Sequence, residues 1–140
     1  MHRQAAAVAL AGITLLLTAG PVRAHHAFSA EFDVNKPITL KGTVVKWEMI
    51  NPHSWFHLDV KEPDGTSVEW MIEGGSPNTL IRQGVTKNTL KIGMELTVEA
   101  YEAKDATHKA VGRNFVLPDG RRLFVGSQSN PDAPAGASDK

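Results

Sequence analysis

The chain has 140 residues, with 15 basic and 15 acidic side chains and no cysteine. A chain of this length builds one domain with a single modest core, and without cysteine an exported domain must be held by packing alone. Balanced charge with no basic run argues against a nucleic acid or an anionic membrane surface as the partner, because both are recognised through clustered Lys and Arg.

Residues 1–24 are typical of a secretory signal peptide. Arg3 supplies a short positive segment, and the apolar stretch over residues 5–17 is shorter than the roughly 20 residues that a membrane span needs. Val22-Arg23-Ala24 then places small or apolar residues where a signal peptidase reads the chain. We therefore expect cleavage after Ala24, a periplasmic or secreted protein, and no membrane insertion after signal cleavage.

Residues 25–37, which begin HHAFSAEFD, are expected to form an N-terminal arm. Phe28 and Phe32 are four residues apart, so one turn of helix would bring them together. An extended arm pinned by the same two aromatic side chains fits equally well. Residues 33–37 have the composition of a turn.

Three segments with strand patterns follow, over residues 38–50, 54–60 and 67–73. The first is rich in β-branched residues and contains Gly42, which indicates a bend in one long strand. In the second, apolar and polar side chains alternate, which places His57 with Trp55 on the face opposite the apolar side chains.

A short helix is predicted over residues 77–83. Ser76 is a good N-cap, Pro77 suits the first helical position, and Gly84 suits the position after the end. One more strand and a final hairpin over residues 109–125 are expected after the helix.

This order of elements predicts an all-β fold with one short helix. Five strands with a helix between the third and the fourth is the order of the OB-fold, a small, partly open Greek-key barrel. We expect an OB-like barrel domain over residues 38–126, with a five- or six-stranded β-sandwich or meander as the alternative. Residues 127–140 lack bulky apolar side chains, so we expect a disordered tail.

His25 and His26 stand directly after the predicted cleavage position. Cleavage after Ala24 would make His25 the first residue, and its α-amine and ring nitrogen can close a chelate on one metal ion. A further imidazole would complete a planar set of three nitrogens, called a histidine brace, which suits Cu(II). The ring of His26 is poorly placed to join the same chelate.

The further imidazole is expected from His53 or His57. His53, which follows Asn51-Pro52, is preferred, and a regular strand would separate the two histidines by about 13 Å, too far for one ion. Met49 is considered as a soft axial ligand and Trp55 as a wall of the site. The alternative stays open that His57 is a surface residue and that His53 only hydrogen-bonds its own turn.

Several motifs together resemble a family of small exported bacterial proteins that is catalogued as a domain of unknown function. They are HHAFSAEFD, KPITLKGTV, NPHSW, GGSPNTLIRQGVTKNTLKIGMELTVEAYEAKD and LPDGRRLF. The resemblance covers residues 25–126 and begins at the predicted cleavage position, so it supports cleavage after Ala24. It implies no known activity.

The leading hypothesis is a non-enzymatic, exported metal-binding protein that takes copper at His25 and at His53 or His57. The alternative is a binding module without a metal, in which Trp55 and His57 hold a periplasmic partner protein or a small ligand. An enzyme, such as a copper oxidase or a small hydrolase, is a third hypothesis, and no paired catalytic groups in the sequence support it.

Overall fold

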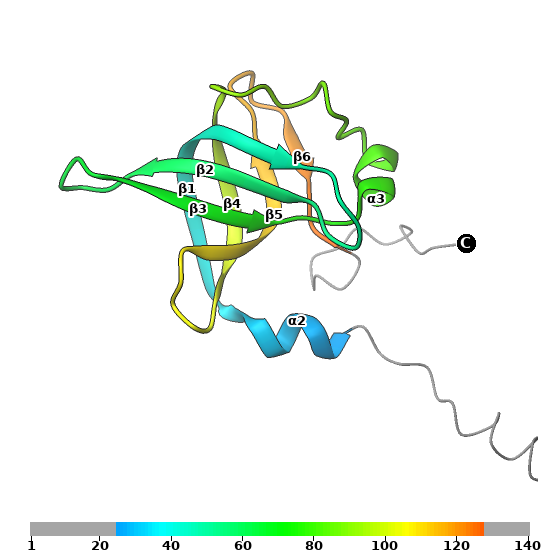
Figure 1. Ribbon diagram of the computed structural model, residues 1–140, viewed down its shortest axis with the longest axis horizontal. Coiled ribbons are helices and arrows are strands. Elements are labelled where there is room, and N and C mark those ends of the chain that lie inside the picture. The colour runs from blue at the N-terminus through cyan, green and yellow to red at the C-terminus, as the bar shows by residue number, and fades with distance from the viewer. Residues whose placement is uncertain (1–24, 128–140) are drawn as a thin grey trace, which may run out of the picture.

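The computed structural model describes residues 25–127 (Figure 1). The predicted signal peptide, and all but the first residue of the predicted tail, lie outside these residues. The elements in chain order are α2 (His25–Glu31), β1 (Phe32–Glu48), β2 (Trp55–Lys61), β3 (Ser67–Glu73), α3 (Pro77–Arg82), β4 (Glu95–Ala103), β5 (Lys109–Val116) and β6 (Arg122–Phe124). Within residues 25–127, no helix is both long and apolar enough to cross a membrane.

The strands form one sheet in the order β3-β2-β1-β4-β5-β6, and neighbours in this order run antiparallel. A parallel contact between β3 and β5 brings the sheet back on itself, although it covers only Met71–Glu73 and Lys109–Val111. The sheet is therefore a partly closed ring and not a complete barrel. The prediction of an all-β fold is confirmed, with the short helix α3 between β3 and β4 as expected.

The long strand β1 joins the two halves of the ring, because its first part pairs with β4 and its second part with β2. Gly42 lies where the strand pairs with both neighbours, and a Cβ there would come within 2.9 Å of the Asp59 carbonyl oxygen. The close approach explains a glycine at this position, and the register shift of the β1–β2 ladder lies further along, between Val44 and Lys46.

The start of β1 differs from the prediction. The strand begins at Phe32, whereas a turn was expected over residues 33–37. The turn chemistry is still present, because the Asn35 backbone N–H donates to the Asp33 carboxylate at 2.9 Å. The register against β4 shifts between Phe32 and Pro37, so an irregular stretch interrupts the paired strand.

Helix α3 has the end signals that its sequence predicts. The Ser76 hydroxyl accepts from the Thr79 backbone N–H at 3.3 Å, Pro77 occupies the first turn, and Gly84 has a positive φ of 83°. Leu80 joins the main core, which the inward side chains of the ring form. Large members of this core are Val44, Phe56, Leu58, Ile72, Val98 and Phe115.

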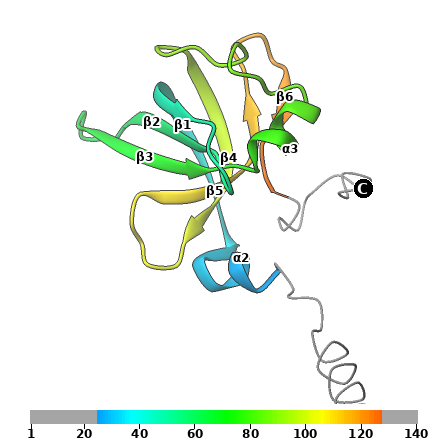
Figure 2. The same cartoon turned by 45° about the vertical axis from the view of Figure 1, so that its right-hand side comes forward.

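Helix α2 packs against a second, smaller cluster outside the main core. Phe28 and Phe32 pack there with Tyr101, Ala103 and Val111 from β4 and β5, and the Phe28 ring meets the Tyr101 ring edge-on at 6.0 Å. The arm is therefore helical over residues 25–31, one of the two forms that the phenylalanine spacing allowed. Helix α2 lies at one end of the sheet, below the strands in both ribbon views (Figures 1 and 2).

Candidate functional site

The connection between β1 and β2 places His53 next to the point where the ring closes. Its Asn51–Pro52 peptide is cis. The backbone N–H of Ser54 donates to the Gly75 carbonyl at 3.0 Å, and the Ser54 carbonyl accepts from the Gly74 N–H at 2.8 Å. These two bonds tie the turn to the segment that follows β3. A Cβ at Gly74 would lie 2.6 Å from the Phe56 ring, which explains a glycine at this position.

His53 faces Glu73, the last residue of β3. The Nδ1 of His53 lies 3.0 Å from Oε1 of Glu73, at an angle outside that of a regular hydrogen bond, so the contact is mainly electrostatic. The Glu73 side chain is 12% exposed and the His53 side chain 41%. Because Nδ1 itself is buried while the side chain is 41% exposed, the exposed part of His53 lies elsewhere on the side chain.

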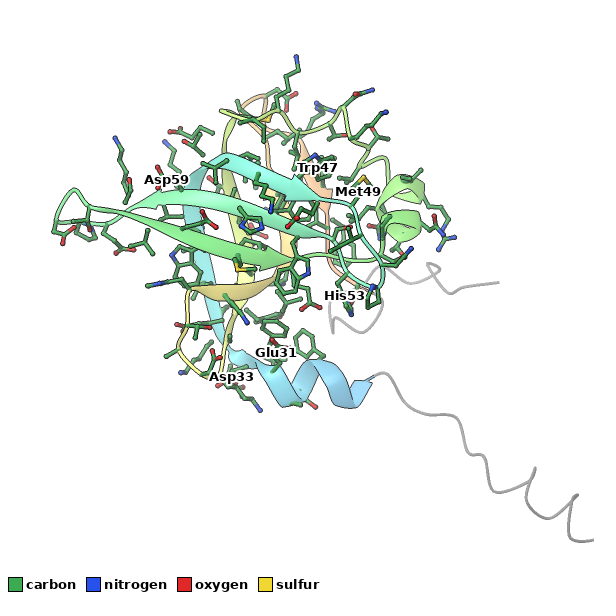
Figure 3. The ribbon with its side chains drawn as sticks, viewed as in Figure 1. Glu31, Asp33, Trp47, Met49, His53 and Asp59 are labelled. Atoms are coloured by element: carbon green, nitrogen blue, oxygen red, sulfur yellow. The ribbon has the colours of Figure 1, made fainter. Side chains whose placement is uncertain are left out.

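The carboxyl of Glu73 is influenced by three other ionisable groups. Burial raises its pKa above the usual range, the charge of His53 and that of Lys109 act against this rise, and the carboxylate of Glu31 adds to it. Glu31 is the last residue of α2, so the arm, β3, β5 and the His53 turn all contribute charges to one region. Figure 3 shows His53 and Glu31 on the side of the molecule where α2 lies.

His57 has a different environment from His53. Its Nδ1 lies 2.7 Å from Oε1 of Glu69, and its Nε2 lies 3.2 Å from Oε2 of Glu48. The residue is 7% exposed, so the alternative of a solvated surface histidine is wrong. Since both ring nitrogens already face carboxylates, His57 has no free lone pair for a metal ion. A hydrogen bond from Lys46 lowers the pKa of Glu48, and the hydrogen bond with His57 acts in the same direction.

The two histidines at the predicted mature terminus begin helix α2. The side chains of His25 and His26 lie outside the part of the structure that is described. Both ribbon views place the start of α2 on the side of the molecule that carries the β1–β2 turn (Figures 1 and 2). Among the described side chains, no three His, Asp or Glu come together to hold a metal ion. A metal site with three such ligands at His53 thus requires at least one ligand from outside these described side chains.

Met49 and Trp55 were considered as secondary residues of the site. Met49 is half-buried and packs against the main core, and Figure 3 shows it beside α3, apart from His53. Trp55 is half-buried and pairs with Glu73 across the β2–β3 ladder, next to the partner of His53. Trp55 therefore lies where it could form a wall of the proposed metal site. Because His57 is buried between carboxylates, Trp55 is the one of these two residues that remains available on the face proposed for a metal-free ligand.

Glu48, Glu69 and Glu73 contact His53 or His57, and none of them is among the site residues predicted from the sequence. Glu69 and Glu73 lie two positions before and two after Met71 on one strand face, a pattern that is typical of solvated side chains. A signal was present, because the Glu-Pro-Asp-Gly turn after β2 sets the hairpin register and places His57 opposite Met71. Residues two positions from a directly opposed pair are diagonal neighbours, so Glu69 and Glu73 both lie within reach of the histidine strand.

Comparison with known proteins gives one match. The model of a family described as a family of unknown function, DUF6152, matches residues 12–112. No curated protein and no solved structure matches the chain significantly. The matched segment contains α2, the β1–β2 turn and the end of β3, and therefore the whole region around His53.

Proposed function

The chain belongs to the family of unknown function DUF6152, and we propose that it is a non-enzymatic, exported metal-binding protein that holds Cu(II) through His25 and His53. The observation that carries the proposal is the half-exposed imidazole of His53, which has its Nδ1 buried against Glu73. Under the proposal, Nε2 is the ring nitrogen that binds the ion, and the backbone bonds of Ser54 hold the turn that carries it.

The docking of α2 supports the same proposal. Residue 25 lies three residues before Phe28, about 4.5 Å along a helix axis, and Phe28 is buried against Tyr101. The carbonyl groups of Ser29 and Glu31 accept from Lys104, at 2.6 Å from its ammonium and at 2.9 Å from its backbone N–H. The start of the mature chain would therefore be held close to the sheet, which reduces the ordering cost of metal binding.

The donor set fits Cu(II) better than other common metals. Cleavage after Ala24 would give His25 an α-amine beside its imidazole, and His53 would add a second imidazole. Three nitrogens in one plane suit the tetragonal preference of Cu(II), which also stands highest in the affinity order of divalent ions. We propose metal binding or delivery, without catalysis.

The test begins with the exported protein. Intact mass should show His25 as the first residue, and a chain that begins at His26 or later would exclude the amine chelate. Competition titration should then give one Cu(II) per chain, with nitrogen hyperfine coupling in the electron paramagnetic resonance spectrum. His108→Gln is a suitable control because His108 is exposed and belongs to the β4–β5 turn.

Two variants separate this proposal from the metal-free binding module. One glycine added before His25 keeps both rings and destroys the amine chelate, and His53→Ala removes the second imidazole. Each should weaken Cu(II) binding by tenfold or more. Weak binding that neither change affects would contradict the proposal and would favour the binding module.

A further inference from the structure

We infer that Glu73 is a positioning residue, which keeps the proton of His53 on Nδ1 and so reserves Nε2 for the metal ion. This inference rests on the proposed function. A carboxylate only accepts, so at 3.0 Å it attracts an N–H at Nδ1 and repels a lone pair there. Because Nδ1 is buried, water does not relieve that repulsion.

The distance between the two groups is set by the backbone. The main chain at Glu73 pairs with Trp55 of β2 on one side and with Val111 of β5 on the other, at the place where the ring closes. His53 precedes Ser54, whose N–H and carbonyl both bond to the glycines that follow Glu73. The same junction therefore holds both partners, and neither relies on a long flexible loop.

His57 provides an internal comparison. It has carboxylates at both ring nitrogens, from Glu69 and Glu48, whereas among the described residues His53 has a carboxylate contact at Nδ1, from Glu73. A metal-binding histidine commonly gives its second ring N–H to a carboxylate, which fixes the tautomer and makes the ligating nitrogen more basic. The carboxylate of Glu73 can act on Nδ1 of His53 in this way through its charge, whereas the two carboxylates at His57 leave no ring nitrogen for a metal ion.

The tautomer can be measured without any metal. Long-range ¹H–¹⁵N NMR spectra of the metal-free mature protein, labelled with ¹⁵N-histidine, should show His53 protonated on Nδ1. Glu73→Ala should move His53 toward protonation on Nε2, and Glu73→Gln, which keeps an acceptor oxygen, should largely restore the original state. Glu69→Ala is the matched control, since it should change the signals of His57 and leave those of His53 in place.

Copper titration of the same proteins completes the test. Glu73→Ala should lower the affinity for Cu(II) by about 10- to 100-fold, while Glu69→Ala should leave it unchanged. Wild-type His53 protonated on Nε2, or a tautomer that ignores Glu73→Ala, would overturn the inference even if copper binds. The expected tautomer in a protein that binds no copper would instead overturn the proposed function, and with it any role of Glu73 toward a metal.

Discussion

At the scale of single residues, the outer side of the sheet holds two histidines that differ in what their rings can still bind. His57 is buried between Glu48 and Glu69, so its charges and hydrogen bonds are satisfied within the protein. His53 has one carboxylate partner, Glu73, and an exposed edge. The alternation of strand residues predicts the face of His57 correctly, but burial on that face depends on the long side chains of neighbouring strands.

Two surface turns give a prediction about acid stability. Asp64 accepts from the hydroxyl and backbone N–H of Thr66, and Asp105 does the same with Thr107. These bonds favour the carboxylate, so the side-chain hydroxyl and then the backbone N–H lower the pKa of both groups below 3.8. A lowered folded-state pKa contributes stability that is present above the unfolded-state value and is lost as the pH falls through the folded-state value.

We therefore expect Asp64→Asn and Asp105→Asn to flatten the pH dependence of unfolding. Wild type should lose more stability than either variant between about pH 5 and pH 2.5, because Asn keeps an acceptor oxygen and has no carboxylate to protonate. Urea unfolding at several pH values measures this difference. Equal losses in wild type and variants would show that the two turns do not contribute.

Glu73 shows why the site could only partly be predicted. His25 directly follows the predicted cleavage position and His53 directly follows Asn51-Pro52, so the sequence is sufficient to identify both histidines. The contact between His53 and Glu73 joins residues of different elements, and it depends on strand register and on the bonds from Ser54 to the glycines. Neither the strand register nor these backbone bonds can be predicted from the residue spacing along one strand.

At the scale of elements, the predicted strands and α3 follow from alternation and from end signals, whereas the arm depends on tertiary packing. Two phenylalanines four residues apart allow either a helix or an extended segment, and the pocket formed by Tyr101, Ala103 and Val111 decides between them. The polar residues 33–37 look like a turn in the sequence, yet pairing with β4 on either side draws them into β1.

Docking of α2 gives a second prediction. Phe28→Ala should remove the main apolar contact of the helix, at a cost of about 3 kcal/mol for a buried phenylalanine. Amide hydrogens of residues 28–31 should then exchange much faster, and Cu(II) affinity should fall. The β1–β4 ladder over residues 38–43 should stay protected, because its partners Leu96, Val98 and Ala100 belong to the main core.

Val34→Ala is the control for this change, because Val34 is an apolar residue near the arm that is 45% exposed. It should leave both exchange and copper affinity close to those of wild type. Retained protection of α2 in Phe28→Ala would mean that the bonds from Lys104 hold the helix without the aromatic contact.

At the scale of the whole molecule, the proposed ligands come from two segments, the start of α2 and the β1–β2 turn. An ion bound only in the folded state stabilises it by about 2.7 kcal/mol when its free concentration is 100 times the dissociation constant. We expect this gain from Cu(II) in urea unfolding of the mature protein. The chain with one glycine before His25 should gain far less, and an equal gain would place the copper elsewhere.

The contact between α2 and the β4–β5 turn has a consequence for the order in which the molecule is completed. Ser29 and Lys104 are separated by 75 residues, so α2, the first of the described elements to be synthesised, has no docking surface until Lys104 has been made. Contacts of such long separation form late in folding. Under the proposed processing after Ala24, a peptidase meets an arm that is still undocked, so cutting comes first and docking second. Under the proposed function, docking of α2 on the β4–β5 hairpin then holds the new chain end beside the sheet.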